Sequence, residues 1–201
     1  LFASVIFTAS KESFRLSTTK LHVMGHGIDV DFFSPDPAAS RGAAVLSVGR
    51  FSPTKRHDLV LRAAAHFPYS VWLVGDGPEH RNLEKLAEKL SLASRVHFFG
   101  AHTHEELRDE YRRASVFVHT SETGSLDKVV LEALACGLPV VTTSAALRDL
   151  PVTLVAATPE AIAEGVRSAY GADTHALPAY VREHHSLQKL IPAMLHVLQQ
   201  A

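Results

Sequence analysis

Short apolar runs alternate with amphipathic stretches along most of the sequence, and this alternation leaves few folds open. Several of the apolar runs are continuous, which is typical of strands that helices cover on both faces. The order strand, helix, strand recurs five times. The sequence therefore predicts an α/β fold, a Rossmann-like doubly wound parallel sheet, whose ligands bind in the loops beyond the carboxyl ends of the strands.

These patterns also give the expected elements and their order. The expected strands are residues 4–8, 21–24, 44–49, 71–75, 96–100, 116–120, 140–143 and 153–155. The expected helices are residues 53–66, 79–91, 104–113, 127–136, 159–170, 178–185 and 187–200. Residues 25–37 carry Gly, Asp and Pro with little periodicity and are the best linker candidate. We therefore divide the chain into residues 1–34, an interdomain-side strand/helix and linker, and residues 35–201, the Rossmann-like domain with its C-terminal helices.

Charge and cysteine content exclude several classes of protein. The 201 residues carry a formal charge of -1, so no basic field argues for nucleic acid or an anionic membrane. No apolar stretch reaches the roughly 18 residues that span a bilayer, and we see no signal peptide. The single cysteine, Cys136, excludes a disulfide framework and is expected to be an inert, packed thiol in a reducing compartment. Because the sequence begins with Leu1 rather than Met, we expect a fragment whose partner half is missing.

The stretch SVGRFSPTKRHD joins an expected strand to a helix. Ser52 is placed to cap that helix, and Pro53 suits its first position. Arg50 before the helix and Lys55 in its first turn put two cations at a helix N-terminus, which favours a phosphate site. The alternative is that Lys55 and Arg56 are solvated and Arg50 caps a carbonyl. The stretch is not a P-loop, because no G-x-x-x-x-G-K-[ST] occurs.

A second strand–loop–helix site is expected at SETGS, residues 121–125. Backbone N–H groups near Gly124 are placed to meet phosphate or sugar oxygens. Ser125 or Asp127 is placed to cap the helix that follows. Asp127 would compete with a bound anion, so its plainer role is that of a helix cap or first-turn acid.

Glu132 is the only charged residue between positions 129 and 141. An ionised carboxylate in apolar surroundings is costly unless it is paired or hydrogen-bonded. One interpretation is a pair with Lys128 one turn earlier, which contributes only about 0.2–0.5 kcal/mol. The other is that Glu132 accepts hydrogen bonds from the hydroxyls of a ligand, as acids do with ribose in other doubly wound folds. The residues alone leave both open.

Histidines offer a weaker signal. His102 and His104 stand in FFGAHTHEEL, and a His-x-His pair can bind metal, but no nearby acid or Cys cluster supports a site, so we expect no metal. No Ser–His–Asp order or nucleophile elbow is present.

Taken together, five stretches resemble the C-terminal half of a family 4 retaining glycosyltransferase of the GT-B fold. They run, in order, GHGIDVDFF, VGRFSPTKRHDLVLRAA, LVGDGPEHRNLEKLAEKL, RVHFFGAHTHEEL and ASVFVHTSETGSLDKVVLEALACGLPVV, and they cover residues 23–143. The resemblance implies one half of a GT-B fold that binds a nucleotide-diphospho-sugar as donor, without a metal or other cofactor. It also implies that the N-terminal, acceptor-binding domain is absent from this chain.

The resemblance also assigns roles to single residues. Arg50 and Lys55 match the pair that holds the donor diphosphate, and they are the expected catalytic residues because they stabilise charge on the leaving group. Glu132 matches the second acid of the family's E-x7-E motif, which takes the ribose hydroxyls. The further donor-binding residues that it implies are Gly49, Gly100, Ala101, Glu122, Gly124, Ser125 and Leu126.

The sequence departs from the family at the first acid of that motif. Gly124 stands eight residues before Glu132, where the family usually has Glu, and the usual EGFG reads GSLD. Glu122 and Asp127 are the two acids placed to take that position.

The expected function is transfer of a sugar, with retention, from a nucleotide-diphospho-sugar to an acceptor hydroxyl. The expected location is the cytoplasm or the inner face of the membrane, reached through the missing half. We expect the fragment alone to be inactive. Two alternatives stay open: another GT-B enzyme, such as a nucleotide-sugar epimerase, and a non-catalytic nucleotide-sugar-binding module.

Overall fold

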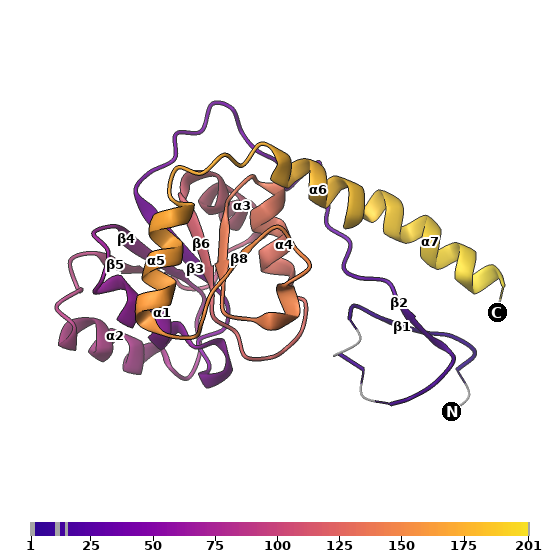
Figure 1. Ribbon diagram of the computed structural model, residues 1–201, viewed down its shortest axis with the longest axis horizontal. Coiled ribbons are helices and arrows are strands. Elements are labelled where there is room, and N and C mark those ends of the chain that lie inside the picture. The colour runs from indigo at the N-terminus through magenta and orange to yellow at the C-terminus, as the bar shows by residue number, and fades with distance from the viewer. Residues whose placement is uncertain (1–2, 11–12, 15, 201) are drawn as a thin grey trace.

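A six-stranded parallel sheet forms the centre of the protein (Figure 1). The computed structural model describes residues 3–10, 13–14 and 16–200. The strands lie in the order β5-β4-β3-β6-β7-β8, and every neighbouring pair is parallel. They are β3 (Ala44–Val48), β4 (Ser70–Val74), β5 (Val96–Phe98), β6 (Val116–His119), β7 (Val140–Thr142) and β8 (Thr153–Leu154).

Helices cover both faces of this sheet, and each face has its own apolar core. One core joins the sheet to α1 (His57–Ala64), α2 (His80–Lys89) and α5 (Pro159–Ala169). The other joins it to α3 (His104–Arg113), α4 (Lys128–Ala135) and α6 (Ala176–His184). The central strands are buried on both faces, as their continuous apolar runs predict. The predicted α/β, doubly wound parallel fold is confirmed.

The strand order reverses between β3 and β6. From β3 the chain moves outward to β4 and β5, and it then crosses back to β6 on the other side of β3. At such a reversal the loops after the two strands turn to opposite faces and leave a crevice between them, which is where open α/β sheets bind ligands. The loops after β3 and β6 therefore mark the place to look for a site.

Two local features fix the elements around this crevice. Thr103 and Glu106 form a reciprocal capping box at the start of α3. Gly137, with a φ of 72°, follows the C-cap residue of α4 and terminates that helix. The loops after β3 and β4 approach so closely that a Cβ on Gly75 would lie 2.0 Å from the carbonyl oxygen of Gly49. Only glycine fits at position 75.

The helix expected at residues 53–66 is divided in two. A 3-10 turn, η1 (Pro53–Lys55), is followed by Arg56 in the left-handed conformation, with a φ of 52°, and α1 begins only at His57. Ser52 occupies the N-cap position of η1, but its side chain makes no capping bond. A non-glycine residue in this conformation costs about 1–2 kcal/mol, so the surrounding contacts must hold it there.

The segment at residues 25–37, expected to be a linker, is packed into the fold. Ile28, Val30 and Phe33 are buried. The backbone of Ile28 forms hydrogen bonds with the backbone of His185 and Leu187, where α6 is followed by α7 (Leu187–Gln199). The sequence explains this packing, because burial of these apolar side chains is favourable and a flexible linker would leave them exposed to water.

The remaining elements lie beside the main sheet. Strands β1 (Ile6–Thr8) and β2 (Leu21–Val23) pair in parallel, and no helix occurs in the part of residues 1–34 that the structure describes. The turn η2 (Ala145–Leu147) follows β7, and α7 (Leu187–Gln199) extends toward β1 and β2 (Figure 1). Within the described residues, we find no helix with the length and apolarity needed to cross a membrane.

Candidate functional site at the β3–β6 crevice

Two loops lie side by side beyond the carboxyl ends of β3 and β6. They are residues 49–56 and residues 120–127, and their strands pair directly in the sheet. The hydroxyl of Thr120 lies 2.8 Å from the carbonyl oxygen of Lys55 and 3.0 Å from that of Arg56. Because these hydrogen bonds join the side chain of one loop to the backbone of the other, the position of Lys55 depends on both strands.

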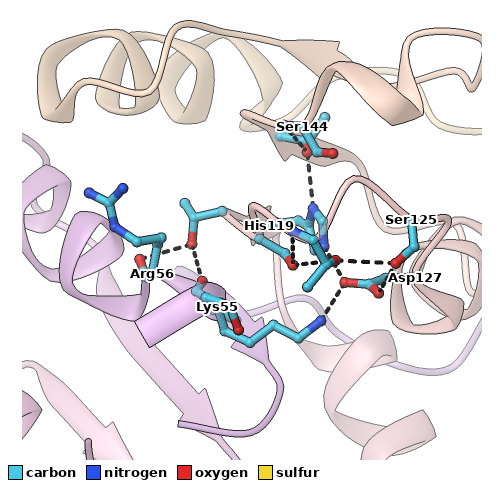
Figure 2. Close-up of polar contacts among 12 residues, drawn as sticks. Lys55, Arg56, His119, Ser125, Asp127 and Ser144 are labelled. Atoms are coloured by element: carbon cyan, nitrogen blue, oxygen red, sulfur yellow. Dashed lines mark hydrogen bonds and ion pairs between the residues drawn. The ribbon is translucent and has the colours of Figure 1, made fainter. Parts of the chain in front are cut away.

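Asp127 is the centre of the polar contacts between the loops. Its Oδ2 accepts hydrogen bonds from Nζ of Lys55 at 2.6 Å and from Nε2 of His119 at 2.8 Å. Figure 2 shows the two side chains converging on the carboxylate from different elements. Burial raises the pKa of Asp127, but the hydrogen bonds from His119 and Lys55 outweigh burial and hold this pKa far below its ordinary value. Asp127 stands at the N-cap of α4, one of the two positions predicted for the cap, but its side chain makes no cap bond and binds Lys55 and His119 instead.

His119 is buried on the last residue of β6, with a side chain only 4% exposed. Its Nδ1 lies 3.1 Å from Oγ1 of Thr142 on β7, and this oxygen also accepts the N–H of Ser144 at 3.1 Å. The polar network therefore crosses from η1 through α4 and β6 to β7.

A second buried imidazole, His57, lies beneath the loop after β3. Its Nδ1 faces Oγ of Ser47 at 3.2 Å, while its Nε2 has no hydrogen-bond partner among the described residues. A Cβ built on Gly49 would lie 3.7 Å from that Nε2. Burial lowers the pKa of His57 to about 4, so the ring is neutral near pH 7.

The two predicted phosphate ligands differ in their surroundings. Lys55 is directed into the crevice and 23% exposed. Arg50 is exposed at the start of the loop, and its guanidinium makes no hydrogen bond or ion pair within the described part of the chain. The interpretation of Lys55 as a merely solvated residue is wrong, because it is paired with Asp127.

Glu122 points to a different partner. Its carboxylate pairs with the guanidinium of Arg56, which also contacts Asp58. Its N–H donates to the carbonyl oxygen of Thr54 at 2.9 Å. These contacts brace the left-handed Arg56. Of the two acids considered for the position of the missing motif Glu, Glu122 is thus engaged with Arg56 and Asp127 with Lys55.

Glu132 lies on α4, a little over one helical turn after Asp127. It is 8% exposed, and its Oε2 accepts a hydrogen bond of 3.1 Å from the hydroxyl of the fully buried Tyr111 on α3. Burial raises the pKa of Glu132, although the Tyr111 bond opposes this, and burial also raises the pKa of Tyr111. The structure shows no ion pair between Glu132 and Lys128, so that interpretation is wrong.

The surroundings of Glu132 include open space. A cavity of about 340 Å³ has a wall formed by Glu132, Lys128 and His104, and its other lining residues are Gly27, Ile28, Asp29, Phe32, Phe33 and Glu105. Lys128 follows Asp127, the partner of Lys55, in the chain, but no residue of the loop at 49–56 lines this cavity. The assignment of Glu132 to ribose hydroxyls stays a prediction.

The other predicted donor-binding residues are spread along the same edge of the sheet. Gly124 has a φ of 67°, and a Cβ there would meet nothing within 4 Å. Ser125 donates to Asp127 at 3.4 Å, and Leu126 is partly buried against the core. Gly100 and the exposed Ala101 follow β5, and the carbonyl oxygen of Gly100 accepts the N–H of Gly75 at 2.7 Å.

Other sequence-derived expectations concern Cys136 and the histidines. Cys136 is fully buried, and burial raises its pKa to about 12, so the thiol is packed and inert as predicted. His102 lies 4.0 Å from Glu106, and His104 begins α3. Among the residues that the structure describes, no group of three or more His, Cys, Asp and Glu is arranged to hold a metal.

Sequence reasoning missed His119 and Tyr111. His119 had a detectable signal, because an imidazole inside the apolar run VFVHT needs a polar partner when it is buried. Tyr111 had none, since a tyrosine on an amphipathic helix is an ordinary core residue. Its contact with Glu132 depends on the packing of α3 against α4.

Comparisons with known proteins show the family of this chain and its fold. The family described as Glycosyl transferases group 1 matches residues 31–148. D-inositol 3-phosphate glycosyltransferase from Mycobacterium sp. (strain JLS) is 38% identical over 151 residues, which cover 68% of this chain and 34% of that protein. The protein of the same name from Mycolicibacterium smegmatis is 34% identical over 174 residues, covering 78% of this chain and 39% of that protein. The matched region thus spans little more than a third of these relatives.

Solved structures share the fold. HepE from Anabaena, in complex with UDP and glucose, superposes with a TM-score of 0.87 at 18% identity, covering 100% of this chain and 64% of that chain. Sucrose-phosphate synthase from Thermosynechococcus elongatus gives a TM-score of 0.77 at 24% identity, covering 91% of this chain and 53% of that chain. At these identities the likeness concerns the fold alone.

Proposed function

This chain belongs to the glycosyl transferases group 1, and we propose that it is the donor-binding part of a retaining hexosyltransferase. Its donor is a nucleotide-diphospho-sugar, and the sugar passes with retention to an acceptor hydroxyl. HepE, which shares the fold, is described in complex with UDP and glucose, and this supports a uridine nucleotide as the first donor to test.

One observation carries the proposal. At the point where the strand order reverses, the loop after β3 and the first turns of α4 bring a lysine and a buried carboxylate to the same edge of the sheet. Lys55 is bonded to Asp127 at the start of α4, and Glu132, a little over one turn further along that helix, lines a cavity. A cation for phosphate and an acid for ribose hydroxyls are the two groups that a nucleoside diphosphate needs from a doubly wound fold.

Each residue then has a separate task. Arg50 and Lys55 hold the diphosphate and stabilise the charge that develops on it as the bond to the sugar breaks. Glu132 accepts hydrogen bonds from the ribose diol. Gly49, Gly100 and the residues at 124–126 bring backbone close to the donor. The acceptor and its hydroxyl come from a further part of the protein.

We propose that this further part is an N-terminal, acceptor-binding half. The short span of the relatives that this chain matches supports it. So do the apolar residues of α7, because Ile191, Leu195 and Leu198 are each more than half exposed. The chain alone is therefore expected to bind nucleotide weakly and to transfer no sugar. The cytoplasm is the proposed location, with any association with the inner face of the membrane made through that half.

Calorimetric titration of the chain with UDP, GDP and ADP tests the donor site. Replacing Arg50 or Lys55 with Ala removes a charged hydrogen bond that contributes about 1.5–3 kcal/mol, so the nucleoside diphosphate should bind about tenfold or more weakly. The corresponding nucleoside should bind as before. Lys85→Ala is the matched control, because Lys85 is an exposed lysine on α2.

Three results would overturn the proposal. Failure of all three diphosphates to bind, or equal weakening of nucleoside and diphosphate, would remove the phosphate assignment. Sugar transfer by the chain alone would remove the need for a second half. Product analysis of a longer protein that contains this chain separates transfer from the epimerase and from a non-catalytic module, since only transfer yields a glycosylated acceptor.

A further inference from the structure

A row of polar side chains occupies every second position of the loop after β6. Oγ of Ser121 lies 3.0 Å from Oγ1 of Thr123, which lies 3.1 Å from Oγ of Ser125. The hydroxyl of Ser125 donates in turn to Oδ1 of Asp127 at 3.4 Å. Ser121 is buried, Thr123 is exposed, and Ser125 and Asp127 are half-buried. Most of this polar row is therefore open to solvent, and it ends on a carboxylate.

The two carboxylate oxygens of Asp127 have different surroundings. Oδ2 accepts hydrogen bonds from Lys55 at 2.6 Å and from His119 at 2.8 Å (Figure 2). Within the described part of the chain, Oδ1 accepts only the long bond from Ser125. Because each oxygen of a carboxylate can accept more than one hydrogen bond, Oδ1 remains available to a further donor group.

The neighbouring Lys55 indicates which part of a ligand can meet this oxygen. An ammonium has three N–H donors, and the only partner of Nζ among the described residues is Asp127. Lys55 can therefore bind a diphosphate while it stays paired with Asp127. A carboxylate repels phosphate, so the group that meets Oδ1 must carry hydrogen-bond donors. In a nucleotide-diphospho-sugar, the sugar hydroxyls next to the anomeric carbon lie beside the diphosphate and are such donors.

We propose that Asp127 binds the sugar of the donor: Oδ1 accepts the proton of a hydroxyl next to the anomeric carbon, while Oδ2 keeps Lys55 and His119. The inference rests on the proposed function, since it takes Lys55 to be a phosphate ligand. The hydroxyls of Thr123 and Ser125 continue the same polar surface. Asp127 thereby selects a donor hexose with free hydroxyls at C2 and C3 over the corresponding deoxy sugar.

The other acid of this loop is already engaged elsewhere. The carboxylate of Glu122 pairs with the guanidinium of Arg56, and its backbone N–H donates to Thr54. Gly124 has no side chain to offer, and a Cβ there would meet nothing within 4 Å. Asp127 is thus the acid of residues 121–127 that both adjoins Lys55 and has an oxygen available.

Calorimetric titration of Asp127→Asn with UDP and UDP-glucose tests the inference. Asn keeps the shape of the side chain but loses its charge, so the affinity for UDP-glucose should fall about tenfold more than the affinity for UDP. Comparing two ligands on one variant cancels any loss of folded protein. Asp109→Asn, at an exposed acid on α3, is the matched control and should bind both ligands as wild type does.

Deoxy analogues test the same contact on the unaltered chain. UDP-2-deoxyglucose or UDP-3-deoxyglucose should bind wild type about tenfold more weakly than UDP-glucose does. The same analogue and UDP-glucose should bind Asp127→Asn alike.

Four results would overturn the inference and leave the proposed function intact. They are equal weakening of UDP and UDP-glucose by Asp127→Asn, equal binding of UDP-glucose and both analogues by wild type, failure of UDP-glucose to bind a wild type that binds UDP, and a selective loss of UDP-glucose in Glu122→Gln instead. Binding of UDP that does not depend on Lys55 would overturn the proposed function itself.

Discussion

Replacing Glu132 with Gln separates a ligand-binding acid from a structural one. The carboxylate is buried and lines the cavity beside α4, and its one hydrogen-bond partner among the described residues is the hydroxyl of Tyr111 at 3.1 Å. The carbonyl oxygen of Gln can still accept the Tyr111 bond. The substitution therefore removes a charge and leaves the shape and the internal hydrogen bond in place.

The stability of this variant should not fall at neutral pH. Burial raises the pKa of Glu132 above its value in the unfolded chain. For an acid with a raised pKa, the favourable contribution is fully present below the unfolded pKa of about 4.3 and is lost as the pH rises through the folded pKa. Glu132→Gln should thus equal or exceed wild type in free energy of unfolding at pH 7, and the two should converge toward pH 4 in urea titrations.

The affinity for nucleotide should fall at the same time. Charge-assisted bonds to a ribose diol contribute about 1.5–3 kcal/mol, so UDP should bind roughly tenfold to a hundredfold more weakly to Glu132→Gln. The 2′,3′-dideoxy analogue should bind wild type and variant alike. A variant that is less stable at pH 7 and loses the same affinity for both nucleotides would refute the ribose assignment and make Glu132 a structural partner of Tyr111.

Two other predictions concern the loop after β3. The pKa of His57 in the folded protein, about 4, lies below its ordinary value of 6.5, so wild type should lose about 3 kcal/mol of its free energy of unfolding between pH 6.5 and pH 4. His57→Gln should keep this stability, and an equal dependence of the free energy of unfolding on pH in the two proteins, measured by urea titration, would contradict this. Gly75→Ala places a Cβ 2.0 Å from the carbonyl oxygen of Gly49 and should lower the free energy of unfolding by about 2 kcal/mol or more. Unchanged stability and unchanged UDP affinity would instead show that the loop moves to accommodate the Cβ at little cost.

The sequence predicts the fold well because its main signals are local. The continuous apolar runs at β3, β6 and β7 and the periodic helices between them specify a parallel, doubly wound sheet before any contact is known. Apart from the start of α1, the observed boundaries of the helices and strands differ from the expected ones by at most two residues. The break at Arg56 escapes prediction because a left-handed arginine is held by Glu122, which is distant in sequence.

The candidate site is only partly readable from sequence for the same reason. Lys55 and Asp127 stand out as charges in strand–loop–helix junctions, and Glu132 stands out as the only charge between positions 129 and 141. Their partners, His119 and Tyr111, are supplied by other elements, and neither contact is implied by spacing along the chain. The packing of α3 on α4 creates the Tyr111 contact. The path of the loop between β6 and α4 creates the His119 contact.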